Sequence, residues 1–258
     1  MSGPIRGHPC YPPSGALAKI GSGGKSAKIY TFGEPVMSAT LREIYDRLLA
    51  AYGPQSWWPG DSPFEVMVGA VLVQNTSWQN VEKAIRNLRD GDLVEPHALY
   101  QVPLEELEEL IRPAGYFRIK ARRLRNLLQF LVERYDGSLD AMFRQNPPGL
   151  REQLLAVNGI GPETADSILL YAGGLPTFVV DAYTARVFGR HGWIGFDADY
   201  HQIKDHFESG LPQDAAMFNE YHALLVRVGK VRCRKKAPLC EGCPLADLLP
   251  AGGPLEPE

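Results

Sequence analysis

The sequence contains no long uninterrupted apolar run. A membrane-spanning helix needs roughly 20 predominantly apolar residues, and no stretch of the 258-residue chain approaches this. The N-terminus also lacks the apolar segment of a secretory signal. These two absences argue against a membrane-spanning or secreted protein. We therefore expect a cytoplasmic protein that has no membrane partner.

An excess of positive charge is missing as well. The formal net charge is −3 at pH 7, which argues against attraction of nucleic acid to the surface as a whole. Any such affinity must come from local patches, and residues 112–125 and 227–236 are basic stretches. Their basic residues are Arg112, Arg118, Lys120, Arg122, Arg123 and Arg125, and Arg227, Lys230, Arg232, Arg234, Lys235 and Lys236. Each stretch alone fits a solvated helix face equally well.

Cysteine is scarce, with four residues in the chain. Three of them, Cys233, Cys240 and Cys243, cluster near the C-terminus. In a cytoplasmic protein such a cluster indicates a metal site rather than a disulfide framework.

The alternating pattern of β-strands is nearly absent. Residues 178–180 look strand-like, but they are too few and have no partner. Elsewhere apolar residues recur at helical spacing, so we predict an all-α fold. Residues 1–36 are rich in Gly, Pro, Ser and Lys, which predicts a flexible arm. The predicted helices begin near residue 38 and cover about residues 63–74, 76–89, 103–112, 115–135, 139–146, 182–191, 200–208 and 213–231.

Residues 150–187 form the most informative stretch, because two helical runs flank Asn158-Gly159-Ile160-Gly161. Gly159 and Gly161 can adopt backbone angles closed to other residues, and Pro162 suits the first position of the second helix. Bare amides at a helix N-terminus favour a phosphate, so we expect a clamp for the DNA backbone. Asp181 follows the apolar run, where it can cap the next helix, perform chemistry, or do both.

These residues resemble those of the endonuclease III superfamily of helix-hairpin-helix DNA glycosylases, over roughly residues 38–249. Leu155 to Arg186 resembles its hairpin and the loop with its catalytic aspartate. Residues 70–76 resemble its buried helix, which ends in a glutamine that enters the DNA, and residues 115–121 resemble its Gly-aromatic-x-x-x-Lys-Ala segment. The resemblance implies two helical subdomains with a cleft between them. It places the glycosylase core at residues 37–232, with the hairpin at about 150–173 and the catalytic loop at 174–183. A cysteine loop at 233–249 and a tail at 250–258 follow.

The hairpin departs from the family at one position. Bifunctional members carry a lysine there that attacks the sugar and forms a Schiff base. Glu163 occupies that place in this sequence, and a carboxylate cannot form an imine. The resemblance therefore implies a glycosylase without lyase activity from this position, or an inactive relative.

A branch of 3-methyladenine glycosylases resembles the chain more closely. The branch motifs correspond to Trp57-Trp58-Pro59, to residues 159–166, to residues 179–183 and to Gly229-Lys230. Trp78 stands where the branch has an aromatic residue. The resemblance implies that Trp57, Trp58, Pro59 and Trp78 form a base pocket and that Lys230 is carbamylated; the alternative for Lys230 is one more member of the basic patch.

An N-alkylated purine is already positively charged, so its departure needs no protonation, and aromatic faces can bind it by stacking and cation–π attraction. Asp181 is expected to stabilise the sugar cation and to position or deprotonate water. Glu163 either helps to fix the pocket or is an ordinary acid of a first helical turn. The residues expected to contact DNA are Gln74, Gly159, Gly161, Thr164 and Lys120, with Gln74 filling the hole left by the flipped base or touching the opposite strand.

The Cys-x6-Cys-x2-Cys spacing of Cys233, Cys240 and Cys243 resembles three quarters of the family's iron–sulfur loop. A [4Fe–4S] cluster normally takes four thiolates, and Leu249 stands where the family has its fourth cysteine. Three explanations stay open: Cys10 supplies the ligand, a residue other than cysteine does, or the site is degenerate. The cluster is our expectation, with zinc as the alternative.

The combined prediction is a monomeric, monofunctional DNA N-glycosylase that removes alkylated bases of the 3-methyladenine type from double-stranded DNA in base excision repair. In a bacterium it would associate with the nucleoid. Two alternatives remain, namely a glycosylase for oxidised pyrimidines and a catalytically silent helix-hairpin-helix DNA-binding protein.

Overall fold

A computed structural model describes residues 40–257, and every regular element among them is helical. The expected all-α fold is confirmed, and residues 178–180 form an extended connection rather than a strand. The predicted flexible arm lies outside the described residues. The α-helices are α1 (Leu41–Tyr52), α2 (Pro63–Leu72), α3 (Trp78–Asp90), α4 (Pro96–Gln101), α5 (Leu104–Leu110), α6 (Phe117–Tyr135), α7 (Leu139–Phe143), α8 (Pro147–Leu155), α9 (Pro162–Ser167), α10 (Ala182–Arg190), α11 (Tyr200–Gly210) and α12 (Ala215–Val231), and shorter helical turns are η1 (Arg112–Ala114), η2 (Ile168–Ala172) and η3 (Ala246–Leu248).

Local sequence signals explain where most of these helices begin. The side chains of Thr40 and Ser62 accept hydrogen bonds from the third backbone amide of α1 and α2, at 3.1 and 3.2 Å. Ser77 precedes α3, but its side chain makes no capping hydrogen bond. Most boundaries differ from the predicted ones by one to three residues, and α4 has no predicted counterpart. Pro147 begins α8 because proline suits the first position of a helix.

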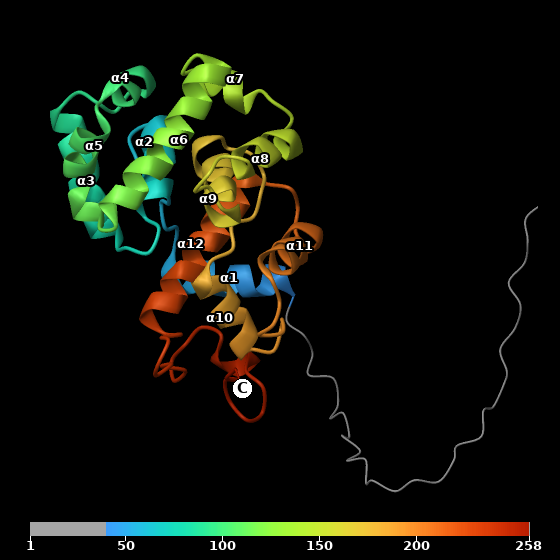
Figure 1. The fold of residues 1–258 in the computed structure, drawn as a ribbon. Helices are drawn as coiled ribbons and strands as arrows, with labels where there is room; N and C mark the ends of the chain where they lie inside the picture. The colour runs from blue at the N-terminus through green and yellow to red at the C-terminus, as the bar shows by residue number, and fades with distance from the viewer. Residues whose placement is uncertain (1–39, 258) are drawn as a thin grey trace, which may run out of the picture. The chain divides into compact units, whose positions relative to one another are not determined.

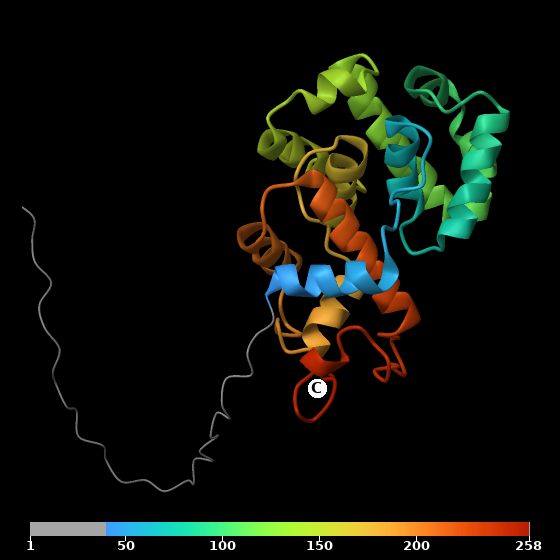
Figure 2. The same cartoon turned by 180° about the vertical axis from the view of Figure 1, so that it is seen from behind.

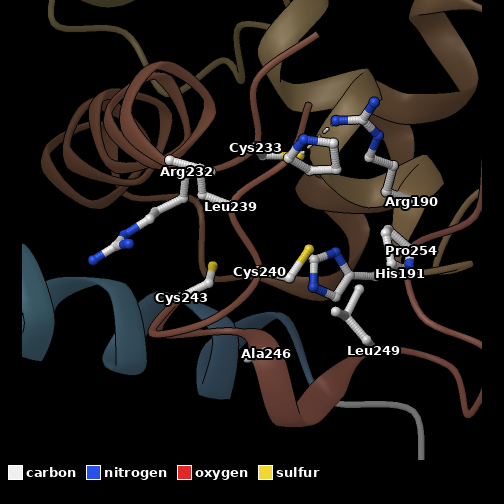
Figure 3. A pocket seen from close by; sticks show the side chains of 11 residues that line it. Arg190, His191, Arg232, Cys233, Leu239, Cys240, Cys243, Ala246, Leu249 and Pro254 are labelled. Carbon is white, nitrogen blue, oxygen red and sulfur yellow. Dashed lines mark hydrogen bonds between the residues drawn. The ribbon is translucent and has the colours of Figure 1, made fainter. Parts of the chain in front are cut away.

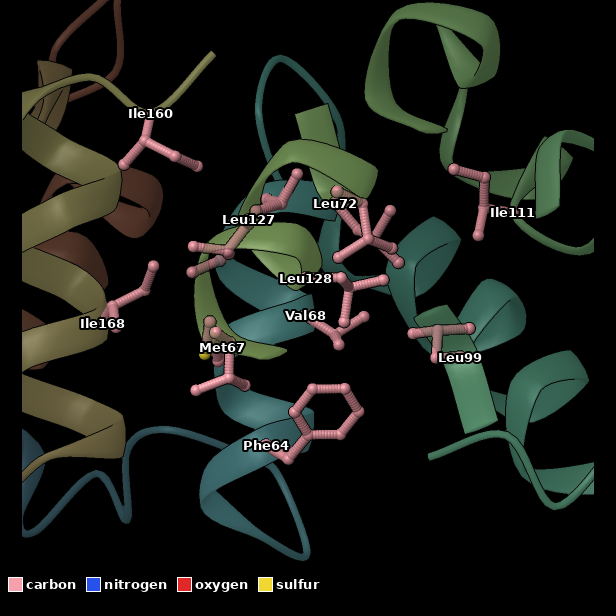
Figure 4. Packing of buried hydrophobic residues seen from close by; sticks show 14 of the residues in the cluster. Phe64, Met67, Val68, Leu72, Leu99, Ile111, Leu127, Leu128, Ile160 and Ile168 are labelled. Atoms are coloured by element: carbon pink, nitrogen blue, oxygen red, sulfur yellow. The ribbon is translucent and has the colours of Figure 1, made fainter. Parts of the chain in front are cut away.

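The buried side chains of residues 40–257 form two clusters, which matches the expected two helical subdomains. The first is built from the middle of the chain, where α2 is buried on all sides between α6 and the hairpin (Figure 4). The second joins the beginning and the end of this part of the chain, since α1 packs against α12 (Figures 1 and 2). Adjacent residues of η2, Leu169 and Leu170, belong to the first and the second cluster respectively. The hairpin helix therefore lies where the two clusters meet.

The glycine hairpin joins α8 to α9. Gly159 has φ +97°, and a Cβ atom there would lie 2.2 Å from Cγ of Arg123, so both conformation and space require glycine. Gly161 has φ −92° and open space around it. The prediction that both glycines use special backbone angles is therefore correct for Gly159 and wrong for Gly161. Pro162 opens α9 as predicted.

A buried carboxylate fixes the second hairpin helix to its surroundings. Asp166 is fully buried, and the guanidinium of Arg151 on α8 donates to its two oxygens at 2.7 and 3.0 Å. The hydroxyls of Thr177 and Tyr200 also donate to it, at 3.1 and 2.8 Å. Asp166 thereby links α8, α9, the connection before Asp181 and α11.

Candidate active site

A cleft of about 1170 Å³ opens where residues of both clusters meet. Its lining combines Trp57 and Trp58 from the loop after α1, the end of α2, the hairpin, the start of α10 and one face of α12. The predicted residues that line it are Trp57, Trp58, Gln74, Trp78, Gly159, Gly161, Glu163, Thr164, Asp181 and Lys230. Segments more than 170 residues apart in sequence thus contribute to one site.

Asp181 caps α10, as one interpretation predicts, and it also lines the cleft, where a chemical role stays a prediction. Its Oδ1 accepts hydrogen bonds from the backbone amides of Tyr183 and Thr184 at 2.9 and 2.8 Å, and from the Thr184 hydroxyl at 3.1 Å. Its Oδ2 lies 3.5 Å from Nε2 of His222. Burial raises the pKa of Asp181, but the attraction of His222 and the bonds from Thr184 outweigh burial, so that the pKa lies below its ordinary value.

His222 and Tyr171 belong to the site and were missed by the sequence prediction. His222 is buried in α12, and its Nδ1 is hydrogen-bonded to the hydroxyl of Tyr171 on η2 (2.5 Å). The available signal was spacing, because His222 precedes Lys230 by eight residues, or about two turns, and so shares its face of α12. An isolated histidine in an apolar helix gave no reason to expect the contact with Asp181.

Glu163 stands in the first turn of α9 and lines the cleft. Glu163 is exposed to the solvent in the cleft. The protein around it still raises the pKa of its carboxyl, first by displacing water and second through the negative charge of Asp181. His222 opposes this shift by its attraction. The hairpin therefore presents a carboxyl group, rather than an amine, toward the same groups as Asp181.

Aromatic rings form one wall of the cleft. Trp58 lies 5.2 Å from Trp78 and 5.1 Å from Tyr171 between ring centroids, and Trp57 lies 5.6 Å from Trp58. A Cβ atom on Gly69 of α2 would lie 3.3 Å from Trp78 and 3.4 Å from Trp58, so glycine lets both rings approach the helix. Pro59 is exposed and is not among the residues that line the cleft, so its predicted place in the base pocket is wrong.

Lys230 lies on the exposed side of the last turn of α12 and lines the cleft. Its ammonium is 5.8 Å from the ring centroid of Trp57 and 5.9 Å from that of Tyr183. Both distances fit cation–π contacts.

Gln74 follows α2 and contacts the hairpin. Its amide nitrogen donates to Oγ1 of Thr164 at 2.9 Å and to the carbonyl of Gly159 at 3.3 Å, and its Oε1 accepts from Arg123. Thr164 is buried. These contacts place Gln74 beside Gly159 and Thr164, and all three residues line the cleft.

Lys120 does not face DNA, which corrects the prediction. Its side chain is 2% exposed, and its ammonium donates to the carbonyls of Leu72 and Ala114 at 2.8 and 2.7 Å. Lys120 therefore ties the end of α2 to η1. Arg125 of the same basic stretch also binds backbone carbonyls, those of Tyr100 and Val102.

Lys120 should make stability depend on pH. Burial, and secondly the positive charge of Arg123, lowers its pKa from 10.5 to about 8. Between these values the unfolded chain holds a proton that the folded chain has lost, so stability from this group rises with pH. From pH 8 to 10 the free energy of unfolding of wild type should rise by about 1–2 kcal/mol relative to Lys120→Met. Urea unfolding of both proteins at each pH measures this, and parallel pH curves would contradict it.

The three C-terminal cysteines line a separate small pocket that shares no lining residue with the cleft (Figure 3). Arg190, His191, Leu249 and Pro254 line it too. Nη1 of Arg190 lies 3.6 Å from Sγ of Cys233, and both ring nitrogens of His191 contact backbone carbonyls. Burial raises the pKa of the Cys240 and Cys243 thiols.

Within residues 40–257 no three His, Cys, Asp or Glu side chains are grouped so that they could hold a metal ion. The donors described there do not fit a cluster with four thiolates, and His191 is already engaged. Cys10, the expected further ligand, lies outside the described residues. The iron–sulfur cluster, with zinc as the alternative, therefore stays a prediction, and its three explanations stay open.

Among the described helices, none combines the length and the apolar character that crossing a bilayer requires.

The chain is similar to known base excision repair proteins. The sequence model of the HhH-GPD superfamily of base excision DNA repair proteins matches residues 68–213. A Methanocaldococcus jannaschii protein, provisionally named a DNA repair glycosylase, is 51% identical over 209 residues, which are 80% of this chain and 94% of that protein. Endonuclease III of Thermotoga maritima is 30% identical over 181 residues, which are 70% of this chain and 79% of that protein.

Two solved structures have a similar fold. A trapped endonuclease III–DNA covalent intermediate superposes with a TM-score of 0.70 at 27% identity, covering 80% of this chain and 92% of that one. The H. pylori 3-methyladenine DNA glycosylase bound to 1,N6-ethenoadenine gives 0.64 at 29% identity, covering 73% and 96%. The chain therefore belongs to the HhH-GPD superfamily of base excision DNA repair proteins, a family of DNA glycosylases.

Proposed function

We propose that this glycosylase removes N-alkylated bases of the 3-methyladenine type from double-stranded DNA by hydrolysis, without lyase activity. The observation that carries the proposal is the composition of the cleft: three tryptophans form one wall, and Asp181 and Glu163 supply carboxyl groups. Aromatic faces suit a flipped base, and they favour a charged one through cation–π attraction. The H. pylori relative, named for 3-methyladenine, supports the same class.

The roles follow from charge. As the glycosidic bond breaks, positive charge develops on the sugar. An ionised Asp181 would stabilise this charge while it positions the attacking water. A cationic base leaves without a proton from the enzyme. Glu163 stands in the first turn of α9, where a lyase would need an amine, so an imine cannot form there.

DNA binding is proposed at the cleft rim. Gln74 lies beside Gly159 and Gly161, and structural relatives were solved on DNA. The hairpin would meet the backbone, and Gln74 would occupy the space of the flipped base or touch the opposite strand. Carbamylation of Lys230 is part of the proposal, because an anion beside Trp57 and Tyr183 would attract a cationic base that the ammonium would repel.

A panel of duplexes with single defined lesions tests the specificity. We expect the purified full-length protein to release alkylated purines and to leave intact abasic strands. Release of oxidised pyrimidines instead would replace the substrate class, and duplex binding without any release would indicate the silent DNA-binding protein.

Borohydride trapping tests the absence of lyase chemistry. Borohydride reduces an imine to a stable protein–DNA adduct, so no adduct should form with wild type. Lys230 lines the cleft, and without carbamylation its amine could form an imine, which makes Lys230→Ala the necessary partner variant. Strand cleavage and trapping in wild type that disappear in Lys230→Ala would contradict the proposal and identify a different nucleophile.

A further inference from the structure

Tyr171, His222 and Asp181 form a chain of contacts. The proposed hydrolysis assigns a role to Asp181 but none to Tyr171 or His222. The hydroxyl of Tyr171 meets Nδ1 of His222, and Nε2 of His222 lies 3.5 Å from Oδ2 of Asp181. His222 is 4% exposed, and its Nε2 is a buried polar atom without a hydrogen-bond partner among the described residues. A buried polar group without a partner lowers the stability of the fold. We therefore expect a functional reason for the burial of this nitrogen beside Asp181.

The contact with Tyr171 selects one tautomer. Burial raises the pKa of Tyr171 well above its ordinary value, so its hydroxyl keeps its proton and can donate it to Nδ1. A neutral imidazole that accepts at Nδ1 carries its hydrogen on Nε2. The opposite tautomer would turn the lone pair of Nε2 toward the carboxylate, which is repulsive.

The two oxygens of Asp181 have different tasks. Oδ1 is occupied by the amides and hydroxyl that begin α10, whereas Oδ2 has His222 as its neighbour. At 3.5 Å this contact is longer than a normal hydrogen bond, so a small closing movement would complete it. A donor on Oδ2 favours the ionised carboxylate and fixes its orientation.

We propose that His222 is the positioning residue of the catalytic carboxylate: Tyr171 fixes its tautomer, and its Nε2–H holds Asp181 charged and oriented toward the sugar. This inference rests on the proposed hydrolysis at Asp181 and assigns the residue that prepares it. His222 acts through Asp181 and does not itself need to touch the base.

Other groups near His222 define the expected pH behaviour. Glu163 faces it from α9, Asp181 and Tyr183 from the start of α10 and Tyr171 from η2, and Lys230 lies on its own helix. Helix α1 packs against α12 and places Tyr45 on Tyr221. Of these groups Asp181 is the one whose protonation stops hydrolysis. Loss of the Nε2–H that faces its Oδ2 should therefore move the acid limb of the rate profile to higher pH.

Single-turnover excision across pH tests the proposal. His222→Leu should lower kcat about 10–100-fold, the effect of a hydrogen bond to a charged group, and move the acid limb upward by about one pH unit. Binding of lesion DNA should stay within about twofold. His222→Gln keeps an N–H near the position of Nε2, so its kcat should lie between those of His222→Leu and wild type. Tyr171→Phe should lower kcat several-fold relative to wild type.

Tyr221→Phe is the matched control. It also removes a buried hydroxyl next to His222, but this hydroxyl donates to the carbonyl of Leu41 at 2.9 Å, away from the cleft. Its excision rate should equal that of wild type. Equal losses in His222→Leu and His222→Gln with an unmoved acid limb would overturn the proposal, because packing alone would then explain the loss.

A measurement without substrate separates this inference from the substrate proposal. Nitrogen NMR of the full-length protein should show His222 as the Nε2–H tautomer, and Tyr171→Phe should remove that preference. The opposite tautomer in wild type overturns the role of His222 whatever base is excised. Excision of another lesion class changes the substrate proposal alone, and the same variants are then assayed on that lesion.

Discussion

Asp181→Asn should abolish base excision while the protein folds and binds DNA normally. The substitution keeps the shape and one carbonyl oxygen, so the amides of Tyr183 and Thr184 keep their acceptor at the start of α10. It removes the negative charge beside the developing sugar cation. Losing preorganised electrostatic stabilisation of this kind costs about 10³-fold in rate.

The measurement pairs single-turnover excision with DNA affinity by fluorescence anisotropy. Asp214→Asn is the control, because Asp214 caps α12 through the same pattern of two backbone amides but is exposed and does not line the cleft. It should leave excision unchanged. An Asp181→Asn protein with near-normal excision would remove Asp181 from the mechanism, and loss of DNA binding or of folding would show that its structural task dominates.

Asp166→Ala should destabilise the fold more than any other single change named here. Asp166 is fully buried, and Arg151, Thr177 and Tyr200 donate to it, with Nζ of Lys204 3.7 Å away. Removing the carboxylate leaves the partly buried guanidinium of Arg151 without its ion-pair partner, whereas Lys204 keeps its pair with Glu208. Breaking a buried ion pair from one side costs about 3–5 kcal/mol, which equilibrium unfolding in urea measures.

Two variants complete the Asp166 experiment. Replacing Asp166 and Arg151 together by leucine should cost much less than the single change, because no uncompensated guanidinium remains. Asp46→Ala breaks the exposed pair of Arg42 and Asp46 within α1 and should change stability by less than about 0.5 kcal/mol. If Asp166→Ala were as mild as Asp46→Ala, the network would not hold the hairpin in place.

The helices and much of the site could be predicted from short stretches of sequence. Helical spacing and caps depend on residues within one or two turns, which explains why α2, α6 and α12 were found from the pattern. Family motifs then indicated Asp181, Glu163 and the tryptophans. The same motifs misplaced Pro59 and Lys120, because a motif records residue types and not the direction of each side chain.

By itself the sequence determined an all-helical chain with a glycine hairpin, an aspartate at a helix start and a glutamate where a lyase needs lysine. Only the tertiary structure decided that Lys120 is buried against backbone carbonyls and that Tyr171 and His222 meet beside Asp181. The physical reason is the distance along the chain over which each interaction acts. Caps and periodicity act between near neighbours, whereas Tyr171 and His222 are 51 residues apart and meet through the packing of η2 against α12.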